Sequence, residues 1–446
     1  MKVIVVGAGA AGLAAAHELR KKGVEVVVFE ESGSAGGRAR GFQEKGYVFD
    51  LGAQFSAVLC ETTFKFCREL GMGDDILPFD FTAAVYRKGK MYPVPGTPSP
   101  SAAWRKRKEL INFRGVPFSA MPVIGRVFPA MLKRYRDFDF ASMNPEPVLD
   151  LCDMSIADFA LRHGGKGALE YFFQPLSATL TLGEPENIGA AHILALLFGL
   201  FGPGLVALAK GIGSLMQAMY EANAEAVRLN TPVRRIVLEN GRAKGVEIDA
   251  GMEEADAIIC ATTASTALRL TPGLPDALRI PLEKVTYSSC VHFIFALRNR
   301  LLPKDWYGVT IPRAEGCIQP GFSDAAGKSK YFAPTGGGLV HCLTYGKNSP
   351  KYEAMPEDEL KQLMIRELQA IVPGRMPDEP LHTVVARWDE AICLDPPGQA
   401  QAIHFMQRDH YREVPGFFLA GEYMYLISCV EGALRSGIKA AEAIGK

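Results

Sequence analysis

The first 30 residues carry the pattern that most restricts the fold of this chain. Residues 3–6 form a short apolar run, and Gly7, Gly9 and Gly12 follow it with the spacing Gly-x-Gly-x-x-Gly. The next stretch, LAAAHELRKKG, has apolar and alanine residues at helical spacing and ends at Gly23. A second apolar run, VEVVVFE, completes the unit. The order predicts strand, tight turn, helix and strand, which is a dinucleotide-binding βαβ unit.

Each position of the glycine turn has a physical task in such a unit. Gly7 permits the turn, Gly9 lets the backbone approach a pyrophosphate, and Gly12 lets the helix pack closely on the strand. Ala10 and Ala11 lie in the glycine turn before the helix, whose positive N-terminal end attracts the pyrophosphate. These five residues form the predicted phosphate-binding part of the site.

The second strand ends at Glu30, which lies 18 positions after Gly12. A carboxylate at this spacing accepts both hydroxyls of an adenosine ribose and repels a 2'-phosphate, so NADP is disfavoured. Glu31 follows directly and is included in the predicted site. The βαβ unit alone is compatible with NAD or FAD.

The residues beyond the second strand decide between the two. The sequence GGR occupies residues 36–38, and an Asp-x-Gly-Ala turn follows at residues 50–53. This combination resembles the superfamily of flavin monoamine oxidases, protoporphyrinogen oxidases and phytoene desaturases. The resemblance implies FAD, with the GGR segment along the flavin pyrophosphate and ribitol and the turn near the flavin ring. It adds Gly37, Arg38, Gly52 and Ala53 to the predicted site.

The C-terminal segment and the centre of the chain carry further matches. FFLAG predicts a buried strand, and an alanine-rich amphipathic helix begins at about residue 430. This segment resembles the last flavin-binding motif of the superfamily, in which the helix start faces the flavin pyrimidine. Residues 210–261 predict helix, strand, turn, strand and a further strand, with one backbone contact to adenine implied. The resemblance adds Val233, Ala261, Gly421, Glu422, Val430 and Ala433, although Val233 is equally a core residue by its apolar character.

The three matching segments predict a discontinuous FAD-binding domain of residues 1–75, 205–280 and 405–446. Residues 76–204 and 281–404 then form the substrate domain. The predicted fold class is α/β, with a Rossmann-like FAD-binding domain and a second, mixed α+β substrate domain. The Gly-Gly-Cys-Tyr motif that tethers flavin in monoamine oxidases has no counterpart before Gly421, so the FAD is expected to be non-covalent.

Composition excludes several other classes of function. The 49 basic and 49 acidic residues of the 446 cancel, so no net field favours nucleic acid. Nine cysteines lack CxxC spacing and eight histidines lack HxH or HExxH spacing, so no metal site is predicted. The scattered cysteines are interpreted as reduced thiols, which favours a cytoplasmic location.

Two stretches raise the question of a membrane. Residues 187–209 are long and uncharged but interrupted by glycines and Pro203, which predicts a buried helix-turn-helix rather than a span. The basic segment 104–114, with Lys133, Arg134 and Arg136 beyond it, is typical of a solvated helix face, or alternatively of a membrane-surface or anionic-substrate patch. Peripheral membrane association therefore stays open.

The substrate side departs from the monoamine oxidases. Their lysine near the flavin corresponds to His292, and an aromatic-cage tyrosine corresponds to Cys429. RWDEAICLDPPGQ and FFQPLSATLTLGEPENIGAAHILAL instead resemble segments of porphyrinogen oxidases and desaturases, whose substrates are large and lipophilic. The resemblance implies dehydrogenation of a lipophilic or amphiphilic small molecule by hydride transfer to flavin N5, with oxygen, a quinone or a carrier as electron acceptor.

His292 is the candidate catalytic residue, as a base or a water-positioning group, because an unperturbed histidine titrates near pH 6.5. A core histidine with both nitrogens satisfied is the alternative. Two other functions remain: a flavin amine oxidase, or a non-oxidative use of the scaffold as in sugar mutases or prenyl-protein escorts.

Overall fold

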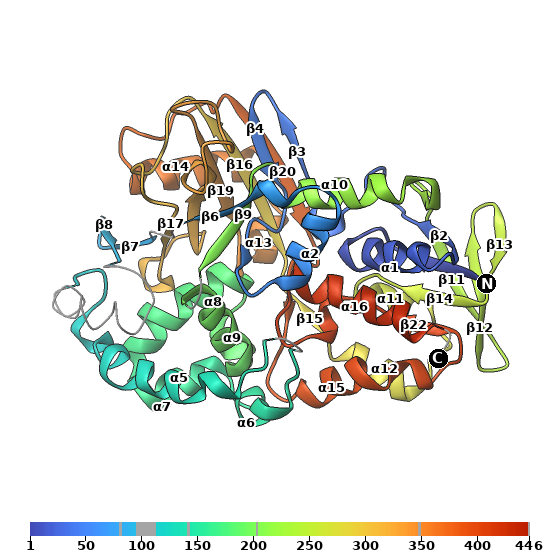
Figure 1. Cartoon of the computed structure of the whole chain (residues 1–446). Coiled ribbons are helices and arrows are strands. Elements are labelled where there is room, and N and C mark those ends of the chain that lie inside the picture. Colours follow the sequence, from blue (N-terminus) through green and yellow to red (C-terminus); the bar gives the residue numbers. More distant parts are fainter. Residues whose placement is uncertain (80–82, 95–112, 141–142, 202–203, 347–348, 445–446) are drawn as a thin grey trace.

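A five-stranded parallel sheet forms one half of the computed structural model (Figure 1). The structure describes residues 1–79, 83–94, 113–140, 143–201, 204–346 and 349–444. The strand order is β10-β2-β1-β14-β22, so the N-terminal strand lies at the centre and the C-terminal strand at one edge. The strands are β1 (Lys2–Val6), β2 (Glu25–Phe29), β10 (Val227–Arg228), β14 (Ala257–Cys260) and β22 (Phe417–Leu419).

Both faces of this sheet are covered, which explains its continuous apolar strands. Val3 and Val5 pack into a core with α1 (Ala10–Lys21), α10 (Ile212–Ala222) and α16 (Val430–Ala443). Ile4 and Val6 face the opposite core, built with α11 (Ala264–Leu270), α12 (Asp276–Glu283) and the antiparallel sheet of β11 (Val233–Glu239), β12 (Arg242–Ile248) and β13 (Gly251–Glu254). The predicted Rossmann-like architecture is confirmed.

A mixed seven-stranded sheet forms the second half, in the order β20-β16-β19-β18-β17-β7-β8. One face packs on α14 (Glu357–Ile371), and the other packs on the hairpin of β3 (Gly41–Glu44) and β4 (Tyr47–Asp50). The second face therefore lies behind the turn at residues 50–54. The strands are β7 (Ala83–Arg87), β8 (Lys90–Pro93), β16 (Cys290–Leu297), β17 (Gly308–Thr310), β18 (Gly321–Asp324), β19 (Gly338–Leu343) and β20 (His382–Trp388).

A helical layer lies below this sheet in Figure 1, at the end away from β3 and β4, and has its own apolar core. Together with the seven-stranded sheet it matches the predicted mixed α+β character. Its helices are α5 (Phe128–Arg134), α6 (Leu149–Cys152), α7 (Ile156–Ala168), α8 (Gln174–Thr181) and α9 (Ala190–Phe201). The other elements are α2 (Glu61–Glu69), α13 (Ser349–Glu353), α15 (Ala400–Arg408), β5 (Ser56–Ala57), β6 (Ile76–Phe79), β9 (Leu205–Leu208), β15 (Thr286–Tyr287) and β21 (Cys393–Leu394).

The helix-turn-helix predicted for residues 187–209 is wrong in its second half. Helix α9 is followed by strand β9, which pairs antiparallel with β5 and β6. Distant partners thus supply the hydrogen bonds that make Leu205–Leu208 a strand, and a local pattern cannot show them. Throughout the described ranges, every helix is too short or too polar to cross a bilayer.

The two large sheets draw on different parts of the chain. The five-stranded sheet uses strands from the ranges predicted for FAD binding, and the seven-stranded sheet uses strands from the ranges predicted for the substrate domain. The domain boundaries themselves stay a prediction.

Candidate flavin site

The glycine turn between β1 and α1 has the three local geometries that the sequence predicted. Gly7 has φ +99°, and a Cβ there would lie 2.8 Å from the carbonyl oxygen of Ala261. A Cβ at Gly12 would lie 1.9 Å from the carbonyl oxygen of Gly7, so helix and turn touch directly. A Cβ at Gly9 would meet nothing within 4 Å. The turn is therefore tightly packed at Gly7 and Gly12 and open beside Gly9, where a ligand can approach the protein backbone.

Two helices begin beside this turn without a side-chain cap. The extended N-cap of α1 is Gly9, which has no side chain, and the extended N-cap of α16 is Cys429, whose side chain accepts no hydrogen bond from the helix. The helices lie against each other, because a Cβ at Gly437 would come 2.1 Å from the carbonyl oxygen of Ala11. Uncapped N-terminal N–H groups attract anions, so these two helix starts fit a pyrophosphate and a reduced flavin ring.

Glu30 is fixed at the end of β2 by the chain itself. Its Oε2 accepts a hydrogen bond from the N–H of Ala8 at 2.8 Å, and its Oε1 accepts from the N–H and the hydroxyl of Ser32 at 3.0 and 2.7 Å. The residue stays partly exposed, so a ribose can reach the carboxylate. The neighbouring Glu31 is exposed. The geometry therefore presents Glu30, more than Glu31, to a bound nucleotide.

The segment predicted to face the adenine lies next to Glu30. The N–H of Thr231 donates to the carbonyl oxygen of Glu30 at 2.8 Å, which holds the start of β11 beside the end of β2. Val233 is buried and packs in the same core as Phe29. Val233 is therefore a core residue, and it also lies beside the predicted adenine position.

The GGR segment lies on the glycine turn. Gly36 donates its N–H to the carbonyl oxygen of Ala8 at 2.8 Å, and a Cβ at Gly37 would come 3.3 Å from the Cα of Gly9. Gly37 has φ +52°, a left-handed conformation that glycine adopts without strain. The two glycines of GGR thus let the backbone lie beside Gly9, and Arg38 follows immediately.

The turn at residues 50–54 packs directly against the GGR segment. Ala53 donates its N–H to the carbonyl oxygen of Arg38 at 3.1 Å. A Cβ at Gly52 would come 2.1 Å from the same oxygen, so no larger residue fits there without moving the backbone. Gly7–Gly12, Gly37 and Gly52 therefore form one continuous series of backbone contacts.

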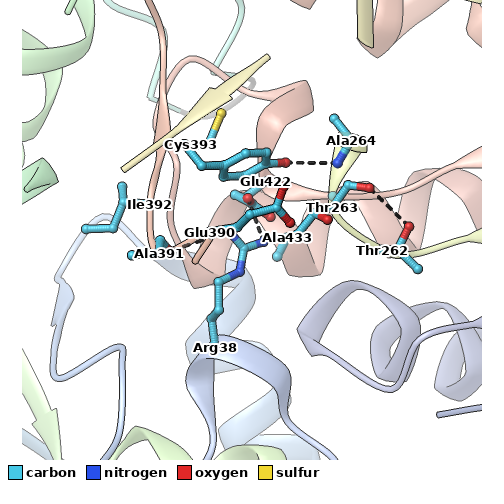
Figure 2. A network of polar contacts seen from close by, with 12 residues as sticks. Arg38, Thr262, Thr263, Ala264, Glu390, Ala391, Ile392, Cys393, Glu422 and Ala433 are labelled. Atoms are coloured by element: carbon cyan, nitrogen blue, oxygen red, sulfur yellow. Dashed lines mark hydrogen bonds and ion pairs between the residues drawn. The ribbon is translucent and has the colours of Figure 1, made fainter. Parts of the chain in front are cut away.

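Arg38 connects this series to the C-terminal motif, as Figure 2 shows. Its Nη2 lies 2.7 Å from Oε1 of Glu422, and its Nη1 lies 3.5 Å from the carbonyl oxygen of Ala391. The guanidinium carbon lies 5.4 Å from the ring centroid of Tyr287. Burial disfavours the charge on Arg38, but Glu422 and Tyr287 outweigh it and raise the pKa of Arg38 above its usual value. The arginine remains charged, and its remaining N–H groups fit a phosphate.

Several residues of this network were not expected from the sequence. The hydroxyl of Tyr287 accepts a hydrogen bond from the N–H of Ala264, at the start of α11, at 3.0 Å. Glu390 accepts a hydrogen bond from Ser265. Tyr287 belongs to no motif, and Glu390 stands at an unspecified position of RWDEAICLDPPGQ. Only the tertiary structure therefore reveals that both lie near Arg38.

His292 has both ring nitrogens engaged in the described structure. Its Nδ1 donates to the carbonyl oxygen of Leu51 at 2.9 Å, and Nδ1 of His341 lies 2.9 Å from its Nε2. The side chain is fully buried, and burial lowers the pKa of His292 to about 4. This is the geometry of the alternative interpretation, a satisfied core histidine that holds the flavin-side turn. Its catalytic role stays a prediction that these contacts do not favour.

The structure brings several of the predicted cofactor residues together from distant parts of the chain. Pairs of direct neighbours join Gly9 to Gly37, Arg38 to Glu422, and Ala11 to the helix that begins at Val430. The uncapped helices, the open space at Gly9 and the partly exposed carboxylate of Glu30 all fit an extended dinucleotide. Within the described ranges, no group of three histidine, cysteine or acidic side chains forms a metal site.

Comparisons with known proteins agree with this geometry. The model of the family described as flavin containing amine oxidoreductase matches residues 10–445. Protoporphyrinogen oxidase 2, chloroplastic/mitochondrial, of Arabidopsis thaliana is 23% identical over 99% of this chain and 93% of that protein. Zeta-carotene desaturase of Capsicum annuum is 22% identical over 100% of this chain and 81% of that protein.

A solved structure gives the same result for the fold. Cyclohexylamine oxidase from Brevibacterium oxydans IH-35A matches with a TM-score of 0.74 at 19% identity, covering 99% of this chain and 98% of that chain. At this level of identity the likeness establishes the fold alone. The family match spans nearly the whole chain and confirms the cofactor predicted from the sequence. The chain therefore belongs to the flavin-containing amine oxidoreductase family and is an FAD-dependent oxidoreductase.

Proposed function

We propose that this protein dehydrogenates a lipophilic or amphiphilic small molecule, with flavin N5 as the hydride acceptor. The finer assignment rests on one observation, which is a cluster of apolar side chains that contacts the turn at residues 50–54 through Trp388. When bound, the flavin supplies the redox chemistry, and the protein binds and orients the substrate against it.

The apolar surroundings are built mainly from β19, β20 and the segment that follows β20. Leu343, Trp388, Ala391 and Ile392 are partly buried and pack as one cluster with Cys290 and Tyr345. The indole Nε1 of Trp388 donates to the carbonyl oxygen of Leu51 at 3.0 Å, so the cluster contacts the turn that is predicted to face the flavin ring. A lipophilic substrate gains free energy there in proportion to the apolar area it buries, about 25 cal/mol per Å².

The same cluster gives little support for an amine substrate. A protonated amine in an apolar site needs a carboxylate or an aromatic cage to offset its desolvation. Cys429 stands where the resemblance expects a cage tyrosine, and Glu184, an acidic group beside Tyr345, is paired with Arg313 at 3.0 Å. Glu390 is nearby in the network of Figure 2, but it accepts a hydrogen bond from Ser265. Amine oxidation is therefore the second candidate.

The residues of the site have distinct tasks in the proposed reaction. Trp388 and Ile392 exclude water and offer an apolar surface to the substrate. Arg38 holds the phosphate region of the cofactor and keeps Glu422 in place. The uncapped start of α16 stabilises the negative charge that develops on the cofactor when the substrate is oxidised.

The test is anaerobic mixing of the holoprotein with lipophilic reductants, such as a porphyrinogen and a polyene, and with a panel of primary amines. Loss of the visible flavin absorbance with a lipophilic compound but with no amine is the expected result. Reduction by amines alone, with hydrogen peroxide formed on readmission of oxygen, would establish the amine oxidase function instead. Conversion of a compound with no net flavin reduction would point to a non-oxidative use of the scaffold.

The electron acceptor is tested in the same preparation. Reoxidation of the reduced protein by oxygen, by a short-chain quinone or only by a protein carrier distinguishes the three predicted acceptors. A Trp388→Phe variant keeps an apolar ring but removes the hydrogen bond to Leu51. We expect it to raise KM for the lipophilic substrate several-fold while FAD stays bound.

Cytoplasmic location and peripheral membrane contact stay predictions. Most of the basic segment 104–114 lies outside the described residues. Lys133 and Arg136 are exposed, whereas Arg134 is paired with Asp137 and Asp150 at 2.6 and 2.7 Å. Of the three cations beyond the segment, two are therefore available to a surface partner.

A further inference from the structure

A buried lysine lies directly behind the turn that the proposed flavin position uses. Lys328 follows the short helix η11 (Ala325–Gly327) at the end of β18, and its side chain is fully buried. Its Nζ donates a hydrogen bond to the carbonyl oxygen of Gln54 at 2.8 Å. The ring of Phe332 lies below the ammonium, with its centroid 4.1 Å from Nζ. Buried lysines are rare without a partner, so this position needs an explanation.

The partner is a carboxylate at the other end of the same turn. Oδ2 of Asp50 lies 3.7 Å from Nζ of Lys328, and Oδ1 accepts a hydrogen bond from the N–H of Gly213 at 3.2 Å. Asp50 is 1% exposed, and its Oδ2 forms no hydrogen bond within the described structure. Lys328 therefore contacts both residue 50 and residue 54 and spans the turn that carries Gly52 and Ala53.

The rest of the turn is held by the same sheet. The carbonyl oxygen of Leu51 accepts hydrogen bonds from Nδ1 of His292 at 2.9 Å and from Nε1 of Trp388 at 3.0 Å. Two neutral donors thus fix one carbonyl, and one cation fixes the other carbonyl together with the carboxylate. Among these contacts, only the one to Lys328 depends on a positive charge.

We propose that Lys328 is a positioning residue of the flavin site, which holds turn 50–54 in the geometry that receives the flavin ring while its amine is protonated. This inference rests on the proposed placement of the flavin ring against Gly52 and Ala53. It assigns to Lys328 a role in cofactor affinity that depends on pH.

Among the titratable groups of this cluster, Lys328 is the one whose pKa lies in the neutral to mildly basic range. Burial lowers the pKa of Lys328 to about 8, although Asp50 opposes the shift. Burial raises the pKa of Asp50 to about 6, and Lys328 limits that rise. His292, His341 and Tyr307 also face the cluster. Burial lowers the pKa of both histidines, to about 4 for His292, and raises that of Tyr307 above its usual value.

The experiment measures the dissociation constant of FAD from the apoprotein between pH 6.5 and 9.5. We expect wild-type affinity to fall about tenfold or more as pH rises through about 8, because the charge-assisted hydrogen bond to Gln54 is weakened. Lys328→Met should bind FAD weakly throughout and lose this step. Lys330→Met, two residues away and exposed, is the matched control and should keep both the affinity and the step.

A double variant guards against misfolding. Lys328→Met leaves Asp50 buried without its cation, whereas Asp50→Asn with Lys328→Met removes both charges. If the double variant folds, retains the visible spectrum of bound FAD and shows no step near pH 8, the proposal holds. The proposal is overturned if the FAD affinity of the wild-type protein does not fall as pH rises through about 8. It is also overturned if this fall persists in the double variant. Failure of wild-type protein to bind FAD at any pH would instead overturn the placement of the flavin itself.

Discussion

Arg38 and Glu422, 384 positions apart in the sequence, lie 2.7 Å apart between Nη2 and Oε1. Both were predicted as cofactor residues from separate motifs, and neither motif indicates that they form a pair. The contact neutralises a carboxylate that would otherwise repel the phosphates of the cofactor. It also fixes the guanidinium fork so that its free N–H groups can bind a phosphate.

Replacing Arg38 by methionine should therefore weaken FAD binding strongly. We expect a loss of about 10- to 100-fold in affinity, because a charge-assisted contact is lost and Glu422 is left without its cation. Arg38→Lys should recover only part of the loss, since an ammonium cannot bond the carboxylate and a phosphate in a fixed fork. Arg68→Met, on the exposed side of α2, is the control. FAD affinity is measured by titrating the three apoproteins. Equal affinities of Arg38→Met, Arg38→Lys and Arg68→Met would contradict the assignment of Arg38 to the cofactor site.

Glu30→Ala should lower FAD affinity by about tenfold or more, since the ribose loses a charged acceptor and Ala8 loses the acceptor of its N–H. Glu30→Gln should retain part of the affinity because the amide oxygen still accepts one hydrogen bond. Glu31→Gln should have a small effect, because that side chain is exposed. Isothermal titration of each apoprotein, with exposed Glu25→Gln as the control, measures the differences. An unchanged FAD affinity in Glu30→Ala would contradict the predicted placement of the ribose beside Glu30.

The contact between α1 and α16 should be intolerant of a single methyl group. Gly→Ala usually stabilises a helix by about 0.5–1 kcal/mol. At Gly437 the added Cβ would lie 2.1 Å from the carbonyl oxygen of Ala11, so the two helices must separate. We expect the free energy of unfolding to fall by about 1–3 kcal/mol in Gly437→Ala.

Gly125→Ala supplies the matched comparison for that measurement. A Cβ at Gly125 would meet nothing within 4 Å. Denaturant unfolding of the two apoproteins should therefore give a loss for Gly437→Ala and little change for Gly125→Ala. A stabilised Gly437→Ala protein would mean that the two helices are less closely packed than described.

The buried histidines should make the apoprotein sensitive to mild acid. Burial lowers the pKa of His292 and of His410 to about 4 in the folded state, against about 6.5 when unfolded. The unfolded chain therefore binds more protons between these values, and stability falls as pH drops from about 6.5 to about 4. Each histidine should contribute about 3 kcal/mol to this fall.

The fall is measured by urea unfolding at pH 7, 6, 5 and 4. His292→Asn should flatten the dependence, since an asparagine can donate to Leu51 without titrating. Asp50 acts in the opposite direction, because its pKa is raised to about 6 and its burial costs more as pH rises. Unfolding free energies that stay constant from pH 7 to pH 4 would contradict the described burial of the histidines.

The nucleotide-binding half could be predicted from the sequence because its signals are local. The glycine spacing, the strand endings and the helix starts each depend on residues within a few positions. β1, α1, β2, α16 and the hairpin of β11 and β12 accordingly lie where they were expected. The strand β9 was missed, since its hydrogen bonds come from β5 and β6.

The candidate site shows the same division. Gly9, Glu30 and Gly37 could be proposed from their motifs, because a short backbone turn imposes its own residue types. Lys328 and Tyr287 could not, because each lies in a stretch with no motif and acts through a contact across the fold. His292 could be found by resemblance, but its hydrogen bond to Leu51 depends on how the β3–β4 hairpin packs on the seven-stranded sheet, and its contact with His341 depends on the pairing of β16 with β19.

The sequence by itself determined the βαβ unit, the FAD-type motifs and the balance of acidic and basic residues, because these depend on residue type and short spacing. Only the tertiary structure decided that Arg38 pairs with Glu422, that His292 is buried with both nitrogens engaged, and that Lys328 spans the turn at residues 50–54. Burial and the distance between two side chains set the charge and the hydrogen bonds of each group, and both arise only when distant segments come together.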